Sequence, residues 1–223
     1  LVVFERSLVC KLRDPGGARK DWTLSVFVGC LYGLVFRAVP NTQEKYNTVL
    51  SALFMATVFS GLVTVSLSII KVPLEKALIL REYTNGYYAL WAWFFGNLAA
   101  TLLVQAVATT AFSIPYYLLI GLAGDYLWML GSFLLLACQG QAFGLLLGVF
   151  ARDAQAAQAI LIPAMMPMII FCGFLLQRHD VQPYFIEFWY ISFFRYGFAP
   201  LVVNEFRYGH FEQCDSPGAH CPL

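Results

Sequence analysis

Residues 184–206 read YFIEFWYISFFRYGFAPLVVNEF, and this stretch decides the topology of the chain. It is long and apolar enough to form a membrane-spanning helix. However, it contains Glu187 and Arg195, and an arginine at the bilayer centre costs about 2.5–3.5 kcal/mol. Pro200 is expected to interrupt the helix, because proline lacks the backbone N–H that a helix uses. We therefore predict two short re-entrant helices that dip into the outer leaflet and return, with aromatic rings at the headgroup level.

The composition of the whole chain indicates an integral membrane protein. Of its 223 residues, 60% are hydrophobic and 12% are charged, and the mean hydropathy is +0.68. Soluble domains carry about 25% charged residues, so lipid must cover much of this apolar surface. The net charge is +1 and no basic patch is present, so we expect the lipid bilayer as a partner and no nucleic acid.

Five other apolar segments each reach the ~20 residues that a membrane-spanning helix needs. They are residues 22–39, 49–70, 88–120, 126–150 and 156–176. The third is too long for one perpendicular span, so we expect an interfacial turn near its start, among Tyr87, Tyr88, Trp91 and Trp93. The predicted fold is an all-α, polytopic helical membrane protein with five spans and an outer re-entrant segment.

The distribution of Lys and Arg predicts the orientation of these spans. Nine of these residues lie on the side that holds residues 1–21, the loop 71–87 and Arg152, and five lie on the other side. The side with more positive charge is expected to be cytoplasmic. Residues 177–223 are then extracellular.

The cysteines divide into two groups. Cys214 and Cys221 fall in the predicted outer segment, where an oxidising compartment lets them pair with each other or with a cysteine outside this chain. We expect such a disulfide rather than two free thiols. The others are expected to pack as small apolar groups: Cys10, Cys30, Cys138 and Cys172.

Motifs for catalysis are absent from the sequence. It contains no G-x-x-x-x-G-K-[ST], G-x-S-x-G, H-E-x-x-H or C-x-x-C, so we expect neither a catalytic nor a metal site in this chain. The second to fifth predicted spans contain no Asp, Glu, Lys, Arg or His, which argues against a proton-coupled transporter. The polar groups left there suit hydrogen bonds between helices or a cavity for an amphipathic molecule. They are Asn97, Gln105, Thr109, Thr110, Gln139 and Gln141.

Glycines mark two of the predicted spans. Gly140, Gly144 and Gly148 share one helix face, and Gly29 and Gly33 repeat the spacing. Without a Cβ at these positions another helix can approach closely. We favour close packing within the same bundle over a dimer contact.

The predicted fifth span combines prolines with methionines. Residues 160–176 read ILIPAMMPMIIFCGFLL, in which Pro163 and Pro167 remove helix hydrogen bonds. The flexible thioethers of Met165 and Met166 adapt to varied shapes. Such a helix either faces a cavity of broad specificity or fills the bundle, and the sequence leaves both readings open.

The loop 71–87 interrupts the apolar pattern with charged residues. Glu75, Lys76, Arg81 and Glu82 alternate there with leucines. The pattern indicates a short amphipathic helix that lies against the membrane or a partner protein. An ordinary connecting loop is the alternative.

Three motifs then follow one another along the chain. The loop is similar to E-x-x-x-F/L-x-x-E-x-x-x-G-Y-Y: Glu75, Glu82, Gly86, Tyr87 and Tyr88 match in register, and Leu80 lies one residue after the F/L position. Residues 171–176 (FCGFLL), 189–198 (WYISFFRYGF) and 204–206 (NEF) form a second, longer signature, and residues 12–15 (LRDP) precede the first span. In order and spacing, essentially the whole chain resembles the membrane domain of the G subfamily of ATP-binding-cassette transporters, the White and breast-cancer-resistance group. Cys172 stands where that family has a serine, and residues 96–100 lack the acid and proline often found near the start of its third span.

The resemblance implies a domain organisation. Residues 1–21 would contain a cytoplasmic elbow helix, residues 22–176 a five-helix bundle and residues 177–223 an extracellular segment with re-entrant helices at 184–206. The family has a sixth span and an N-terminal nucleotide-binding domain, so we expect this chain to be a fragment that lacks both. It is expected to bind no cofactor itself, since ATP and Mg²⁺ belong to the missing domain. Two such halves form a homo- or heterodimer, and the plasma membrane is the expected location.

The resemblance also implies roles for individual residues. Coupling to the nucleotide-binding domain would use Glu75, Arg81, Glu82, Gly86 and Tyr87. A substrate cavity between the two halves would be lined by Phe59, Leu62, Met165, Met166 and Phe171. Phe174 and Leu175 would form a plug below the exit. The re-entrant segment would include Arg195, Tyr196, Gly197, Asn204 and Glu205.

The function implied is that of an ATP-driven exporter for lipids, sterols or other amphipathic compounds. Joined to its nucleotide-binding domain, the protein would be an ATP-hydrolysing translocase. The alternative is a passive channel or structural scaffold without ATP coupling. A membrane enzyme is disfavoured, because no catalytic residues are found.

Overall fold

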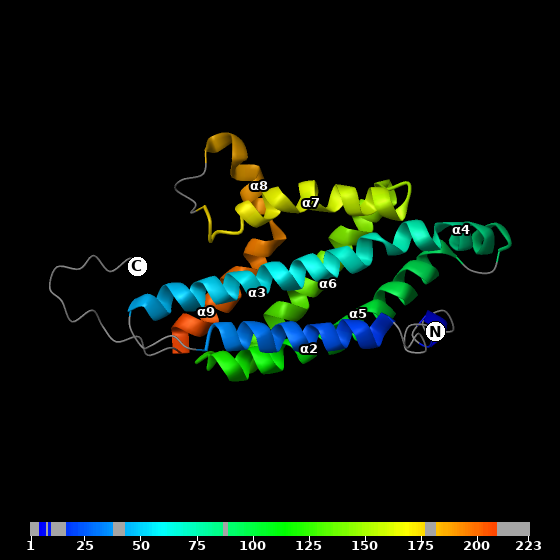
Figure 1. Ribbon diagram of the computed structural model, residues 1–223. Coiled ribbons are helices and arrows are strands. Elements are labelled where there is room, and N and C mark those ends of the chain that lie inside the picture. Colours follow the sequence, from blue (N-terminus) through cyan, green and yellow to red (C-terminus); the bar gives the residue numbers. More distant parts are fainter. Residues whose placement is uncertain are drawn as a thin grey trace.

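The protein was analysed as a computed structural model, which describes residues 5–7, 9, 17–37, 43–86, 89–176 and 182–208. Within these ranges the regular secondary structure is helical throughout (Figure 1). The helices are α2 (Gly17–Val35), α3 (Gln43–Ile69), α4 (Lys71–Thr84), α5 (Leu90–Ile120), α6 (Tyr126–Phe150), α7 (Ala154–Ile170), the 3₁₀ helix η1 (Pro183–Phe185), α8 (Ile186–Ile191) and α9 (Phe193–Tyr208).

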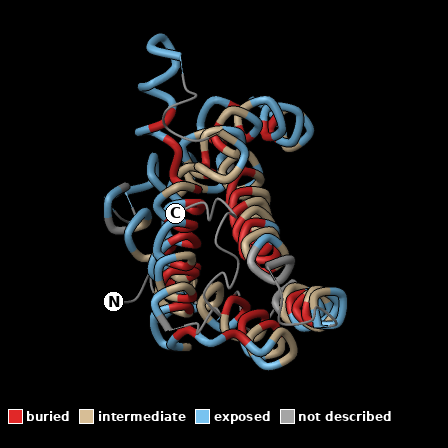
Figure 2. Tube along the Cα trace, turned by 90° about the vertical axis from the view of Figure 1, so that its left-hand side faces the viewer, coloured by how far each residue is buried: buried red, intermediate tan, exposed pale blue. Residues whose placement is uncertain are grey.

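The long helices pack into one bundle. Helix α2 packs along α5, α6 packs along α3, and α9 contacts both α6 and α3. Helix α7 packs on α3, on the side away from the α2–α5 pair (Figure 1). The buried positions follow the inward faces of neighbouring helices, and the outer faces are exposed (Figure 2). Exposed faces with so many apolar residues fit a protein surrounded by lipid.

Helix α4 continues the direction of α3 (Figure 1). Only Ile70 separates the two, and the backbone N–H of Leu74 donates to the Ile70 carbonyl at 3.3 Å. The predicted short helix in the loop 71–87 is therefore present as an extension of the second predicted span. It ends at Thr84, and Gly86, two residues later, has a φ of +72°, a conformation that glycine adopts without strain.

Three helical segments are long and apolar enough to cross a membrane: Asn47–Lys76, Trp93–Ile120 and Tyr126–Phe150. Helices α2, with 19 residues, and α7, with 17, do not meet the same test of length and composition. The all-α membrane fold is thus supported, while the number of five spans stays a prediction.

The expected interfacial turn at Trp91 and Trp93 was wrong. Both residues lie within α5, which runs without a break from Leu90 for 31 residues. At about 1.5 Å per residue such a helix exceeds the thickness of a bilayer core, so it has to tilt or project beyond it. Tyr87 and Tyr88 lie outside the described residues.

The prediction of two helices in the segment 184–206 agrees with α8 and α9, but the expected break at Pro200 was wrong. Helix α9 contains Pro200 within its 16 residues. Phe198 and Leu201, on either side of the proline, are buried in the bundle core. Packing against α3 and α6 therefore holds the helix together across the missing hydrogen bond.

The glycine-rich faces pack inside the bundle, as favoured from the sequence. A Cβ on Gly144 would lie 2.7 Å from the Ser68 Cβ, and one on Gly148 would lie 2.7 Å from the Ile69 carbonyl oxygen. A Cβ on Gly29 would lie 2.6 Å from the Phe112 carbonyl oxygen. These glycines allow α6 to approach α3 and α2 to approach α5.

Candidate functional site

The candidate coupling segment is the free end of α4. Glu82 accepts a hydrogen bond from Arg6 at 2.8 Å, measured from Arg6 Nη2 to Glu82 Oε1, and the two form an ion pair. Arg81 is exposed and Glu75 is half-buried. The pair fastens the end of α4 to the N-terminal residues that precede α2. Tyr87 lies outside the described residues.

The same helix exposes apolar side chains. Leu74, Leu78 and Leu80 are large hydrophobic residues with much of their surface uncovered. Together with Arg81 and the exposed Lys76, they give α4 the mixed character expected of an amphipathic helix. Such a surface suits contact with a lipid headgroup region or with another protein.

The five residues predicted to line a substrate cavity do not gather around one pocket in the described part of a single chain. Phe59 borders a small cavity of about 20 Å³ between α2, α3 and α5. Met165 is 1% exposed and belongs to the core, whereas its neighbour Met166 is 53% exposed. Leu62 is half-buried against that core. Phe171 stacks on Phe185 and Phe188, with ring centroids 6.0 and 6.1 Å away.

The two candidate plug residues differ in their surroundings. Phe174 stacks on Phe54 at 4.4 Å and meets Phe198 edge to face at 6.1 Å, so it joins α3 to α9. Leu175 is 57% exposed. Gly173 just before them has a φ of +100°, and a Cβ there would lie 3.4 Å from the Trp189 ring. The backbone turn at Gly173 thus places Phe174 on the aromatic cluster and leaves Leu175 outside it.

Arg195 is surrounded by aromatic rings. Its guanidinium carbon lies 4.9 Å from the ring centroid of Trp189, 5.6 Å from that of Tyr190 and 5.5 Å from that of Tyr196. The Tyr196 hydroxyl donates to the Tyr190 carbonyl at 3.0 Å, which fixes one of these rings. Cation–π contacts therefore connect α8 to the start of α9.

Replacing Arg195 tests this cluster. Arg195→Leu is expected to lower the free energy of unfolding by about 1.5–3 kcal/mol, because it removes three cation–π contacts and an exposed contact of this kind contributes about 0.5–1 kcal/mol. Arg195→Lys keeps the charge but loses the planar guanidinium, so its stability should lie between that of the wild type and that of Arg195→Leu. Thermal unfolding in detergent micelles measures both, and a Leu variant as stable as the wild type would contradict the role of the cluster.

Asn204 and Glu205 hold the connection between α5 and α6. The buried Glu205 carboxylate, with 5% of the residue exposed, accepts the backbone N–H of Ala123 at 2.9 Å and that of Gly124 at 3.0 Å. The Asn204 amide donates to the Asp125 carbonyl at 3.0 Å and accepts the Asp125 N–H at 3.3 Å. We call residues 121–125 the outer turn; these four bonds clamp it to α9.

Several contacts support the outer turn from the other side. The Tyr117 hydroxyl donates to the Gly124 carbonyl at 2.8 Å, and the Asp125 side chain caps α6 by accepting the Leu127 N–H at 3.2 Å. A Cβ on Gly124 would lie 2.6 Å from the Asn204 amide nitrogen. The turn therefore needs glycine at position 124 for the clamp to close.

One contact that the sequence analysis missed joins α8 to α7. The buried Ser192 hydroxyl donates to the Met168 carbonyl at 2.6 Å, near the end of α7. A serine after an apolar helix gives no sequence signal for this bond. Of the other predicted positions, Gly197 lets α9 pack on α6, since a Cβ there would lie 2.7 Å from a Leu136 methyl group.

The predicted disulfide cannot be placed on this structure, because Cys214 and Cys221 lie outside the described residues. Cys30, Cys138 and Cys172 are free thiols. Cys172 is buried in the core, where it packs as a small apolar group.

Comparison with known proteins gives a family match over most of the chain. Residues 1–206 match the family described as ABC-2 type transporter. The chain is 26% identical over 211 residues to the "Broad substrate specificity ATP-binding cassette transporter ABCG2" of Sus scrofa, covering 92% of this chain and 32% of that protein. It is 27% identical over 212 residues to "ABC transporter G family member 24" of Dictyostelium discoideum, with 92% and 18% covered. It is 25% identical over 226 residues to "Protein white" of Drosophila melanogaster, with 99% and 33% covered. The chain thus spans a third or less of the length of these relatives.

Proposed function

Because this chain belongs to the ABC-2 type transporter family, with relatives in the G subfamily, we propose that it forms the membrane domain of an ATP-driven exporter of lipids, sterols or other amphipathic compounds. The observation that carries the proposal is the family match over residues 1–206. The second to fifth predicted spans carry no Asp, Glu, Lys, Arg or His between their estimated ends, which suits an apolar substrate better than an ion.

In this proposal, α4 transmits the ATP-driven movement of a nucleotide-binding domain. Helix α4 is nearly continuous with α3 (Figure 1). A displacement of the C-terminal end of α4 would therefore be transmitted to α3 within the bundle. The exposed leucines and charged residues of α4 offer a mixed surface for a protein partner. ATP and Mg²⁺ would bind in that partner domain, and the complete protein would be the translocase.

The substrate path would lie between two such membrane domains, paired as a homo- or heterodimer. Exposed apolar residues on α7, such as Ile162 and Met166, remain available to a second half. Phe59, Leu62 and Phe171 are half-buried and remain candidates for the lining, whereas Met165 would act from the core by shaping α7. We propose the plasma membrane as the location.

Transport by the full-length protein tests the proposal. Vesicles that carry it should accumulate a fluorescent lipid or amphipathic dye only with ATP and Mg²⁺. The control replaces ATP by a non-hydrolysable analogue. Equal uptake in both conditions would indicate a passive channel, and no uptake of any amphipathic probe would leave a structural scaffold as the better description.

Glu82→Gln is expected to uncouple ATP hydrolysis from transport. An exposed ion pair contributes at most about 1 kcal/mol to stability, so the protein should still reach the membrane. Coupling energies of 1–3 kcal/mol correspond to about fivefold or more, and transport per ATP should fall by that factor. Glu187→Gln is the matched control, because it makes the same change at an exposed residue on α8, outside the proposed coupling surface.

The double exchange Arg6→Glu with Glu82→Arg separates two explanations for such a result. If the ion pair itself positions α4, the exchange restores transport per ATP. If Glu82 contacts the nucleotide-binding domain directly, it does not. Normal coupling in Glu82→Gln would contradict the coupling role altogether.

A further inference from the structure

Arg195 is a cation at the depth of the long apolar helices. The ring of its neighbour Phe194 packs against Gly61, near the middle of the apolar segment that α3 and α4 form. Gly197, two residues after Arg195, packs against Leu136, near the middle of α6. These contacts place the start of α9 well inside the length of the bundle that lipid surrounds. A charged side chain at such a depth is costly unless it meets an opposite charge.

That opposite charge is missing from the part of the chain that the structure describes. Arg195 is half-buried, and neither an ion pair nor a hydrogen bond of its guanidinium is found there. Glu187 on α8 is exposed and forms no ion pair with it, and the Glu205 carboxylate is bound to the outer turn. Arg195 also lies in the first turn of α9, where the positive end of the helix dipole disfavours a cation. Both features call for an anion from outside the described residues.

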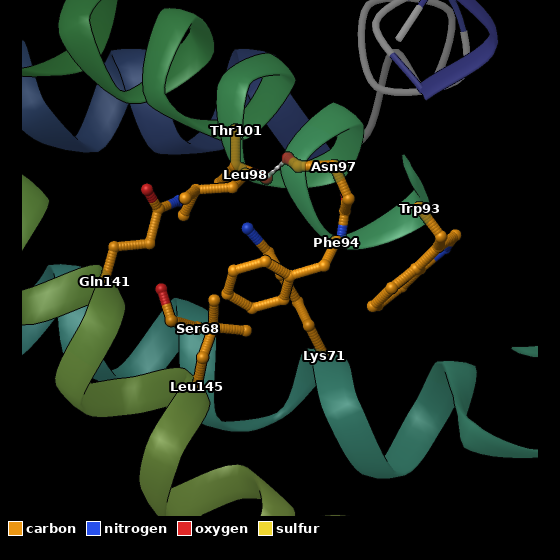
Figure 3. Close-up of a pocket in the computed structure, with 9 residues that line it drawn as sticks. All are labelled: Ser68, Lys71, Trp93, Phe94, Asn97, Leu98, Thr101, Gln141 and Leu145. Atoms are coloured by element: carbon orange, nitrogen blue, oxygen red, sulfur yellow. Dashed lines mark hydrogen bonds between the residues drawn. The ribbon is translucent and has the colours of Figure 1, made fainter. Parts of the chain in front are cut away.

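Lys71 shows how the same bundle accommodates another cation. It borders a pocket of about 10 Å³ whose wall includes the Gln141 side chain (Figure 3). The carboxylates of Asp21 and Glu75 attract it electrostatically. Arg195 has aromatic rings in place of these groups, and rings offset only part of the cost of a cation in lipid.

The rings hold the guanidinium between the protein and its surface. Trp189 is buried, whereas Tyr190 and Tyr196 are exposed. The Trp189 ring therefore supports the guanidinium from the protein side, and the two tyrosines border it where it reaches the surface. Tyrosine suits this position, because its ring is apolar and its hydroxyl is polar, as at a membrane–water boundary.

Apolar side chains surround this cation on the surface. Helix α8 and η1 stand apart from the long helices, above α7 in Figure 1 and at the top of Figure 2, and most of their residues are exposed. Ile186, Phe188 and Ile191 are large exposed hydrophobic residues of α8. The surface thus combines one unpaired positive charge with an apolar area that acyl chains can cover.

A phospholipid provides both the anion and the apolar chains that match this surface. The planar guanidinium presents paired N–H donors that fit two oxygens of a phosphate. We infer that Arg195 binds the phosphate group of a phospholipid, whose acyl chains lie along α8. The headgroup is thereby drawn toward the middle of the bundle, below the level of its neighbours. This inference rests on the membrane fold and does not depend on the proposed transport.

The response of the unfolding temperature to lipid tests this site. The full-length protein is stripped of lipid in dodecyl maltoside, which contains no phosphate. It is then titrated with dioleoyl phosphatidylcholine or with a digalactosyl lipid that has the same acyl chains and no phosphate. The wild type should be stabilised at lower concentrations of the phospholipid than of the galactolipid. Arg195→Gln should need about tenfold more phospholipid for its half-maximal rise, because charge-assisted hydrogen bonds are lost.

Two further variants control for folding and for unspecific charge effects. Each variant is compared with its own unfolding temperature without lipid, so the loss of cation–π contacts does not enter the comparison. Arg207→Gln removes an exposed arginine from the same helix and should keep the preference of the wild type. Arg195→Lys keeps the charge but not the planar fork, so its preference should lie between those of the wild type and Arg195→Gln.

Several results would overturn the inference. Equal responses to the two lipids in the wild type would mean that no phosphate is bound, and an unchanged preference in Arg195→Gln would place the phosphate at another residue. Inorganic phosphate that stabilises as well as the phospholipid would indicate a site for a small anion. An ion pair between Arg195 and Glu187 of a second copy predicts no lipid preference, and an equal loss of dimer in Arg195→Gln and Glu187→Gln.

Discussion

Glu205→Gln is expected to destabilise the protein by about 3 kcal/mol. In the wild type, the buried carboxylate accepts two backbone N–H groups of the outer turn. Hydrogen bonds to a charged group contribute about 1.5–3 kcal/mol each. Glutamine keeps one carbonyl oxygen but turns an NH₂ donor toward the other N–H, so one buried donor meets another. Thermal unfolding in detergent micelles, together with the yield of folded protein, measures the loss.

Glu187→Gln is the matched control for this prediction. Glu187 lies on α8, the residue is exposed, and the substitution is the same. Its effect is expected to stay within about 0.5 kcal/mol. Equal stability of Glu205→Gln and Glu187→Gln would show that the outer turn holds its conformation without the clamp.

The two residues of the clamp show what the sequence could and could not predict. Asn204 and Glu205 were singled out because they interrupt an apolar segment and match a family motif. Their partners could not be predicted, since Ala123 lies 82 residues earlier and contributes only a backbone N–H. Every residue except proline carries that group, so the chain contains no local sign of which N–H will meet the carboxylate.

Local signals explain why some boundaries were predicted well. The predicted span 126–150 has the same limits as α6, because Asp125 caps its N-terminus and the charged Arg152 and Asp153 follow its end. For α5 and α9, tertiary packing overrode the local signal. Phe112 and Tyr116 are buried beside Pro115, and Phe198 and Leu201 beside Pro200, so both helices continue through a proline.

Some features of the candidate sites could likewise be predicted from local sequence signals, and others could not. Packing between helices could be anticipated from the glycine spacing, since a Cβ-free face has few other uses inside a lipid-embedded bundle. The environment of Lys71 could not, because the sequence places it with the charged residues of the loop 71–87. The structure places it where α4 begins, in a pocket with Gln141. A charge at the end of an apolar run can lie in solvent or in the bundle, depending on how far the helix extends.

Gly144→Ala is expected to cost about 3 kcal/mol. The added Cβ would lie 2.7 Å from the Ser68 Cβ and 2.8 Å from the Val65 carbonyl oxygen. Backbone atoms of α3 cannot move aside as a flexible side chain can, so the helices must separate. Inserting even one methyl group into a close-packed contact costs about 1–3 kcal/mol. Because Ser68 lies next to the start of α4, the separation should also reduce transport per ATP.

A series of Gly→Ala substitutions along α6 shows whether the contact with α3 causes the expected loss of stability. At Gly131 an added Cβ would meet no atom within 4 Å, and at Gly140 the nearest atom, the Thr64 Cβ, would lie 3.3 Å away. Alanine favours a helix over glycine by up to about 1 kcal/mol, so Gly131→Ala should be neutral or stabilising. Gly140→Ala should fall between Gly131→Ala and Gly144→Ala. If unfolding temperatures in micelles fell equally for all three variants, helix separation would not be the cause. If the loss of stability instead grows as the added Cβ comes closer to α3, the close approach of α6 to α3, and not helix propensity, limits the stability of the bundle.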